Sequence, residues 1–244
     1  MQKDIPLLAA GTCLESISLY RSKFVHNEPG ESEIKNLKRE NVNPAERRFI
    51  KNNSEKAGRA SDITRDAARL PVILLPVQSL FNRQWGNVFT LGIMYLEVLM
   101  IEQGAAGTVK SISDRMRPFM YNEELPYENK KSAAENGTAN KSFYSGHTST
   151  AFSSVVFFAK VFGDLYPESA MTPCIWGGGL LLASATAYLR VAAGMHFPSD
   201  VFAGAVMGSI IGYAVPCLHY NKTAQVSIFP VINEMIGFGV IINI

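Results

Sequence analysis

The stretch VFAGAVMGSIIGYAVPCL, residues 201–218, carries no charged side chain. About 20 mostly apolar residues in a helix are enough to cross the hydrocarbon core of a bilayer, so this stretch predicts a membrane-spanning helix. Gly204, Gly208 and Gly212 recur within it at every fourth position. Such residues share one face of a helix, and their small size allows a second helix to pack closely against that face.

Further apolar runs extend this pattern along the chain. CIWGGGLLLASATAYL, residues 174–189, is also free of charge and reaches spanning length with its flanking residues. Two other runs contain carboxylates, namely residues 5–20 with Glu15 and residues 88–107 with Glu97 and Glu102. They are either spans with packed or functional carboxylates or buried helices of a soluble protein. The run 226–244 is a weaker candidate, and the two charge-free runs favour a membrane protein.

The spacing of small and apolar residues predicts helices, whereas the alternation typical of strands is rarely sustained. We expect an all-α protein, an antiparallel bundle of about six helices that spans a membrane and carries its active site at one end. The helices are expected near residues 5–20, 67–81, 88–109, 148–163, 173–190 and 200–218. Residues 44–56 add a short surface helix, with Pro44 near its start. Because no linker rich in Pro, Gly or Ser divides the chain, residues 1–244 should form a single domain.

The composition argues against nucleic-acid binding and against a fold held together by disulfides. The formal net charge of the 244 residues is +2, which provides no strong field for binding nucleic acid. Cys13, Cys174 and Cys217 are odd in number, widely spaced and set among apolar residues. We therefore expect buried free thiols and no disulfide framework.

Polar residues in apolar surroundings mark three stretches in the second half of the chain. In the first, KSISDRMRP, Lys110 and Arg117 stand seven residues apart. On a helix this spacing turns through roughly 700°, which returns both cations to one face. The pair suits an anionic ligand, or alternatively satisfies the last carbonyls of a basic helix end.

The second stretch, FYSGHTSTAF, places Ser145, Gly146 and His147 at the start of an expected helix. Unpaired N–H groups at a helix start favour a phosphate, and glycine lets the backbone approach a ligand closely. His147 would then be placed to donate a proton to the bound anion. The alternative is a capping turn supplied by Ser145, Thr148 or Ser149, with an incidental histidine.

The third stretch, AYLRVAAGMHFPSD, holds Arg190, His196 and Asp200, and its Pro198 suits the first turn of a helix. Asp200, four residues after His196, can reach back to one ring nitrogen, which would fix the tautomer and leave the other nitrogen free as a nucleophile or base. A metal site is the alternative. We expect no metal, because the nearby cations would repel one and no compact cluster of Cys, His and carboxylate ligands accompanies the histidine.

The order of the helices brings these stretches to the same end of the bundle. The helix near 88–109 delivers Lys110 at its C-terminal end, and His147 opens the next long helix, which runs away from that end. A short turn sends the chain back, so that Arg190 ends one helix, while His196 and Asp200 begin the following one. We therefore expect a single site.

Together the three stretches resemble the signature of the type 2 phosphatidic acid phosphatase superfamily, which includes lipid phosphate phosphatases, bacterial non-specific acid phosphatases and vanadium haloperoxidases. That signature resembles K-x6-R-P, then P-S-G-H, then S-R-x5-H-x3-D. The first part is intact here, with Pro118 after Arg117. Tyr144 replaces the proline of the second part and Leu189 the serine of the third. Both departures spare the residues that carry charge or protons.

The resemblance implies a two-step hydrolysis without a metal or other cofactor. His196 would attack phosphorus and form a phosphohistidine, Asp200 would orient His196, and His147 would protonate the leaving oxygen. The resemblance also implies which residues bind the phosphoryl oxygens, namely Lys110, Arg117, Ser145, Gly146 and Arg190. Such a polar set fits phosphoryl transfer, in which positioning and charge stabilisation dominate.

We therefore expect a multi-pass membrane phosphatase that hydrolyses a phospholipid or isoprenoid phosphate or pyrophosphate. Undecaprenyl pyrophosphate, phosphatidic acid, phosphatidylglycerol phosphate and lipid A phosphates are all compatible substrates. The resemblance suggests a bacterial inner-membrane protein whose site faces the periplasm or exterior. The alternatives are a soluble non-specific acid phosphatase, a vanadium haloperoxidase and a non-catalytic lipid-binding protein.

Overall fold

The computed structural model describes residues 4–25, 28–81, 85–219, 225–232 and 236–243. Its α-helices are α1 (Asp4–Phe24), α2 (Glu31–Asn36), α3 (Glu55–Phe81), α4 (Trp85–Ser113), α5 (Tyr127–Glu135), α6 (Gly146–Leu165), α7 (Thr172–Ala192) and α8 (Pro198–His219). Three short 3-10 helices lie at Arg39–Asn41, Arg47–Phe49 and Pro118–Tyr121.

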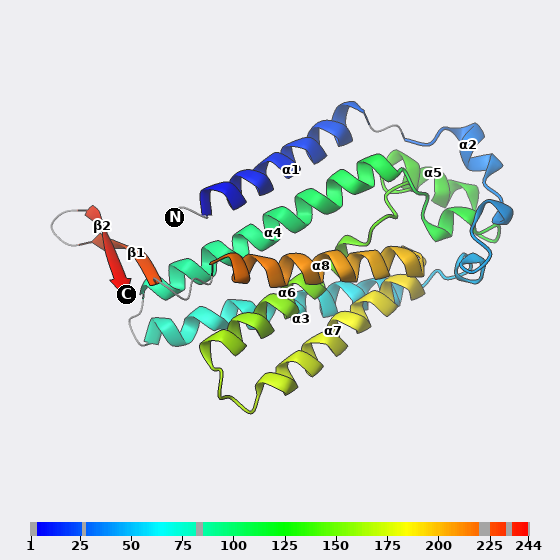
Figure 1. The fold of residues 1–244 in the computed structure, drawn as a ribbon. Helices are drawn as coiled ribbons and strands as arrows, with labels where there is room; N and C mark the ends of the chain where they lie inside the picture. The colour runs from blue at the N-terminus through cyan, green and yellow to red at the C-terminus, as the bar shows by residue number, and fades with distance from the viewer. Residues whose placement is uncertain (1–3, 26–27, 82–84, 220–224, 233–235, 244) are drawn as a thin grey trace.

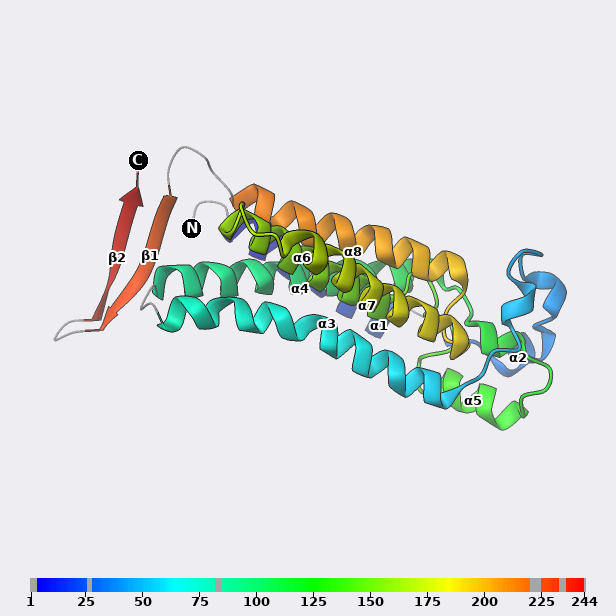
Figure 2. The same cartoon turned by 90° about the horizontal axis from the view of Figure 1, so that it is seen from below.

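Six long helices, α1, α3, α4, α6, α7 and α8, lie side by side in an elongated antiparallel bundle (Figures 1 and 2). The short helices α2 and α5 gather at one end of it. We call residues 28–54 and 114–145 the cap, because they cover the end at which α3, α6 and α8 begin. The predicted helical bundle of about six helices is confirmed.

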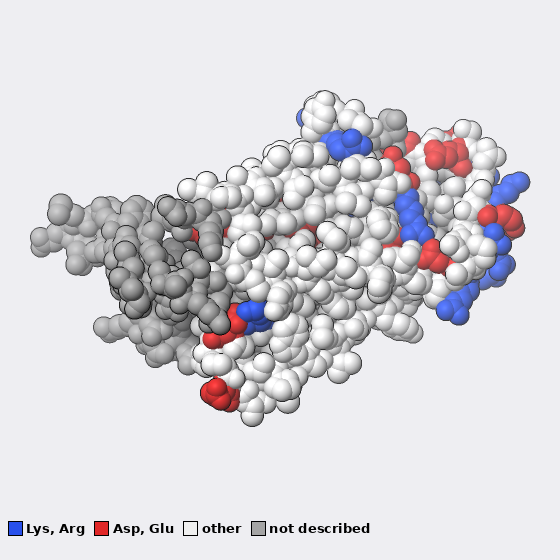
Figure 3. Space-filling view, in the orientation of Figure 1, with Lys and Arg blue, Asp and Glu red and all other residues white. Residues whose placement is uncertain are grey.

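Three helical stretches are long and apolar enough to cross a membrane, namely Val88–Tyr121, Thr172–Ala192 and Pro198–His219. They coincide with three of the predicted helices. Their outward side chains include Leu181 and Phe202, which are 74% and 71% exposed. On the face shown in Figure 3, charged side chains crowd the cap, and the flank of the bundle beside it is largely free of them. Lipid would cover such a flank at little cost.

The closest packing in the bundle joins α6 and α8. A Cβ atom at Gly204, Gly208 or Gly212 would lie 2.6, 2.2 or 2.3 Å from a carbonyl oxygen of α6 or of its capping residue. Real side chains do not tolerate such distances, so only glycine lets the two backbones meet here. The close-packing face predicted from the glycine spacing is confirmed.

Helix α3 begins earlier than the sequence predicts. The expected helix near 67–81 starts at Glu55. The short surface helix expected at 44–56 is absent, because residues 44–54 form turns, a 3-10 helix and a loop, and residues 55–56 already belong to α3. The Ser54 hydroxyl accepts the Ala57 N–H at 3.2 Å and so starts α3. The charged residues that follow hide the helical pattern, because they face the cap end of the bundle rather than an apolar core.

Two further expectations are wrong. The three cysteines are free but exposed rather than buried, because apolar surroundings in this bundle include its outer surface. Residues Gln225–Ile232 and Ile236–Asn243 form an antiparallel pair of strands, β1 and β2, rather than a spanning helix. Their many β-branched residues favour strand over helix.

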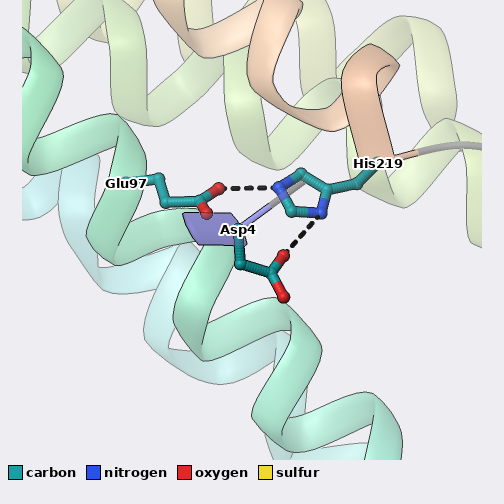
Figure 4. Close-up of side chains that lie close together, drawn as sticks. All are labelled: Asp4, Glu97 and His219. Atoms are coloured by element: carbon teal, nitrogen blue, oxygen red, sulfur yellow. Dashed lines mark hydrogen bonds and ion pairs between the residues drawn. The ribbon is translucent and has the colours of Figure 1, made fainter. Parts of the chain in front are cut away.

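The carboxylates inside the predicted spans are packed against polar partners. At the end of the bundle opposite the cap, the two ring nitrogens of His219 lie 2.7 Å from Glu97 Oε2 and 3.3 Å from Asp4 Oδ1 (Figure 4). Among the described residues this is the one trio of possible metal ligands within 4.8 Å of one another, yet His219 already uses one nitrogen for each carboxylate. Deeper toward the cap, buried Glu102 accepts a hydrogen bond from Thr150 at 2.9 Å.

Gly208→Ala should lower the thermal unfolding midpoint in detergent micelles, because its Cβ would lie 2.2 Å from the Ser149 carbonyl oxygen and would push α8 away from α6. Overpacking of this kind costs about 1–3 kcal/mol. Gly177→Ala on α7 is the matched control, since nothing lies within 4 Å of its Cβ. That change should raise stability slightly. Equal midpoints for the two variants would contradict the close contact of α6 and α8.

Candidate active site

The three stretches singled out in the sequence meet under the cap. A Cβ atom at Gly146 would lie 3.0 Å from Lys110 Nζ, which joins the end of α4 to the start of α6. The Ser145 N–H donates to the Asp200 carbonyl oxygen at 3.1 Å, which joins the start of α6 to the first turn of α8. Helix ends that are distant in sequence therefore enclose one small region.

His196 lies in the turn between α7 and α8 and is 1% exposed. Its Nδ1 is 2.7 Å from the backbone carbonyl oxygen of Ser142. Because a carbonyl only accepts hydrogen bonds, Nδ1 carries the proton and the lone pair of the neutral ring is on Nε2. The imidazole is thus fixed in the tautomer that a nucleophilic Nε2 requires.

Asp200 supports this turn differently from the expected direct hydrogen bond to the histidine. Its carboxylate lies 4.0 Å from His196 Nδ1. It accepts instead from the Phe197 backbone N–H at 2.8 Å and the Ser142 hydroxyl at 2.6 Å. Arg115 donates to it at 2.5 Å. The backbone bond to Phe197 resembles half of a capping box and fixes the start of α8.

Three cations face this region without a carboxylate at ion-pair distance in the described part of the chain. Arg117 donates to the Met195 sulfur at 2.9 Å, and Arg190 makes a long contact of 3.4 Å with the Ser61 hydroxyl. The Nε atoms of Arg117 and Arg190 are buried and have no hydrogen-bond partner. Lys110 is the third cation. Buried unpaired donors are rare in folded proteins, and this set suits a phosphate.

The same cations act on His196. Burial comes first, followed by the charges of Arg117, Arg190 and Lys110, and together they hold the pKa of His196 well below its ordinary value. The ring is therefore neutral near pH 7, and its Nε2 lone pair is available.

The start of α6 supplies the opposite wall. Ser145 is the N-cap, and its hydroxyl accepts from the backbone N–H of Thr148 at 3.4 Å and from the Thr148 hydroxyl at 3.0 Å. Its side chain thus makes the capping turn that the sequence offered as the alternative. The first N–H groups of a helix have no partner within it, and at Gly146 a side chain would fill the space beside Lys110.

His147 stands in the first turn of α6 and contacts α3. Its Nε2 lies 2.7 Å from Asp62 Oδ1 and also 2.7 Å from Arg65 Nη1. One nitrogen cannot donate to Asp62 and accept from Arg65 at once, so the two contacts belong to different protonation states. Burial and then the Arg190 charge lower the pKa of His147 to about 4, against the opposing hydrogen bond with Asp62.

Sequence reasoning missed four contributors. Arg115 stands inside the KSISDRMRP motif, only two positions before Arg117, and its charge was a usable signal. Asp62 and Arg65 lie in the part of α3 before residue 67, for which the sequence predicts no helix. Ser142 acts on His196 through its backbone carbonyl, which has no counterpart in the pattern of side chains.

A buried neutral histidine beside unpaired cations, at the capped end of a helical bundle, is an arrangement suited to phosphoryl transfer. The PAP2 superfamily model matches residues 91–224, more than half of the chain. The chain belongs to the PAP2 superfamily, as the three motifs predicted.

Two curated relatives come from Porphyromonas gingivalis. A lipid A 4'-phosphatase is 27% identical over 128 residues, which are 52% of this chain and 50% of the relative. A lipid A 1-phosphatase is 36% identical over 76 residues, which are 31% of this chain and 16% of the relative. The match therefore spans half of the first relative's length and much less of the second's. No solved structure gives a significant match.

The histidine environment predicts a loss of stability in acid. The folded pKa of His147 is about 4 and its ordinary value is 6.5, so the unfolded chain binds more protons between these values and stability falls as the pH falls through them. The lowered pKa of His196 adds an effect of the same sign. Thermal unfolding in detergent from pH 7 to pH 4 measures this slope. His147→Asn should flatten it, and an unchanged slope would contradict the buried neutral ring.

Proposed function

We propose that this protein is a membrane phosphatase that hydrolyses a lipid phosphate through a phosphohistidine on His196. The observation that carries the proposal is the His196 ring itself. Its Nδ1 is bonded to the Ser142 carbonyl, and it lies near Arg117 and Arg190, whose buried Nε atoms have no hydrogen-bond partner among the described residues. Membership of the PAP2 superfamily and the similarity to the two lipid A phosphatases support it. Residues 1–244 act as one domain in this proposal, since the site uses elements from the cap to α8.

In the first step, Nε2 of His196 attacks phosphorus and an N–P bond forms as the ester P–O bond breaks. Lys110, Arg117, Arg190 and the start of α6 at Ser145 and Gly146 hold the phosphoryl oxygens while charge shifts to the leaving oxygen. His147 donates a proton to that oxygen. The ring of His196 becomes positively charged, and the nearby carboxylate of Asp200 stabilises it.

In the second step, water attacks phosphorus, His147 accepts the proton of the water, and the N–P bond breaks to release phosphate. His147 must therefore be protonated before the first step and neutral before the second. Its low pKa suits the second role. A phosphate dianion beside it favours the charged ring and so prepares it for the first role. Asp62 and Arg65 supply a partner for each state.

The position of the site supports a lipid as the proposed substrate. Lys110, Arg190 and Asp200 all stand in or at the end of stretches long and apolar enough to cross a membrane. A headgroup reaches them while its acyl chains stay in the bilayer. The exposed apolar residues of α7 and α8 favour this location over a soluble acid phosphatase. The proposed location is a bacterial inner membrane, with the cap facing the periplasm or exterior.

His196→Asn should abolish phosphate release, by at least about 1,000-fold in kcat, because the nucleophile is lost. The test is phosphate release from lipid A, phosphatidic acid, phosphatidylglycerol phosphate and undecaprenyl pyrophosphate in mixed micelles. The similarity to lipid A phosphatases makes lipid A the expected best substrate. His219→Asn is the control, since it removes a partly buried histidine at the other end of the bundle and should leave kcat of the folded protein unchanged. Full activity in His196→Asn would rule out the phosphohistidine.

Orthovanadate should inhibit competitively, and chelators should have no effect. Vanadate offers the five-coordinate geometry of the transition state to the same cations, whereas the proposed steps use no metal. Initial rates with orthovanadate and with EDTA test both statements. Inactivation by EDTA that added divalent metal reverses would show that the site works through a metal ion.

A further inference from the structure

We propose that Arg115 and Glu46 are positioning residues that fix Asp200 and, through it, the turn that carries His196. The inference rests on the proposed function, because it assigns these residues to the nucleophile of that reaction. Arg115 lies within the first motif but is not one of its signature residues, and Glu46 lies outside all three motifs.

The guanidinium of Arg115 donates hydrogen bonds to three residues near the proposed nucleophile. Nη1 donates to Asp200 Oδ1 at 2.5 Å and to the Ser199 hydroxyl at 2.8 Å, and Nη2 donates to Glu46 Oε2 at 2.6 Å. Its plane also covers the Phe197 ring, with the central carbon 4.6 Å from the ring centroid. Such a set of contacts needs the planar fork of arginine, which lysine does not have.

Glu46 anchors this arrangement from the cap. It is 8% exposed, and its second oxygen, Oε1, accepts the Ser199 backbone N–H at 3.1 Å. Burial raises the pKa of Glu46, but the hydrogen bonds from Ser199 and then Arg115 outweigh it and keep the carboxylate ionised. Glu46 lies outside residues 91–224, the part of the chain that the superfamily model matches. The cap before α3 therefore contributes directly to the support of the nucleophile.

A continuous chain of contacts leads from Glu46 to the reacting nitrogen. Arg115 holds Asp200 Oδ1, and Asp200 Oδ2 accepts the Ser142 hydroxyl at 2.6 Å. The carbonyl of Ser142 then holds His196 Nδ1 at 2.7 Å. Without Arg115, the fully buried Asp200 would lose its one charged partner, and a buried carboxylate without such a partner tends to take up a proton. The imidazole would then lose both its fixed orientation and its compensating charge.

The same contacts separate Arg115 from the cations that face the phosphate. Arg117 and Arg190 each keep a buried Nε without a partner, whereas Arg115 is occupied by two carboxylates and a hydroxyl. Arg115 should therefore affect the rate of the chemical step and leave phosphate binding unchanged. A residue with a merely structural role would instead lower the amount of folded protein without changing kcat of the folded fraction.

The test uses the full-length protein in detergent, with p-nitrophenyl phosphate as a substrate that does not depend on the lipid headgroup. Arg115→Met should lower kcat by about 10- to 100-fold, the usual cost of losing a partner that orients a functional side chain. KM and the inhibition constant of inorganic phosphate, which reports binding of the ground-state anion, should stay within about twofold of the wild-type values. Arg115→Lys should recover only part of kcat. Glu46→Gln, which keeps the side-chain shape, should lower kcat in the same sense, and the double variant should be no slower than Arg115→Met alone.

Lys51→Met is the matched control, because Lys51 also joins two parts of the cap, through an exposed ion pair with Glu124 at 2.5 Å. Its kcat should equal that of the wild type. If Arg115→Met fails to fold, Glu46→Gln decides, and wild-type kcat in that variant overturns the proposal. A raised KM or weaker inhibition by inorganic phosphate would show that Arg115 binds the phosphate instead. His196→Asn is assayed in parallel, so that its full activity would overturn the proposed function itself rather than the role of Arg115 alone.

Discussion

The contact between α6 and α8 is the constraint on which the site depends. Three glycines of α8 lie directly against carbonyl oxygens along α6, so the distance between the two helices is set by backbone atoms. At the cap end this contact continues into the hydrogen bond from Ser145 to Asp200. The start of α6 and the turn that carries His196, the proposed nucleophile, are thus placed by helix packing, which is stiff, and not by loops.

The arginines of the site differ in how completely their donors are paired, and this difference bears on the proposed reaction. Arg115 is surrounded by acceptors, whereas the side chains of Arg117 and Arg190 retain unpaired donors. Burial of unpaired cations close together is unfavourable in the empty site. In the proposed reaction, a bound phosphate would offset this cost, and the developing negative charge of the transition state would offset more of it. A fixed set of cations would in this way favour reaction over simple binding.

Much of this arrangement follows from the sequence. Charge-free runs and glycine spacing predict the helices, and the antiparallel order then brings Lys110, His147 and His196 to one end. The contributions of Asp62 and Glu46 do not follow, because each depends on long-range packing of a polar segment without apolar periodicity. Ser142 is hidden for a different reason, since it acts through a main-chain carbonyl. The cysteines are exposed rather than buried as predicted. Apolar neighbours do not distinguish the two cases, because they occur on the outer surface of a membrane bundle as well as in its core.

The glycine contact between α6 and α8 also has a consequence for biosynthesis. The proposed site draws on residues from Glu46 in the cap to Asp200 in the first turn of α8, and these groups adopt their geometry only where α8 lies against α6. During translation α8 emerges after the other five long helices of the bundle. A chain that has inserted its earlier helices therefore holds separate fragments of the site without a placed nucleophile. In the proposed function, activity would therefore begin only when α8 docks against α6.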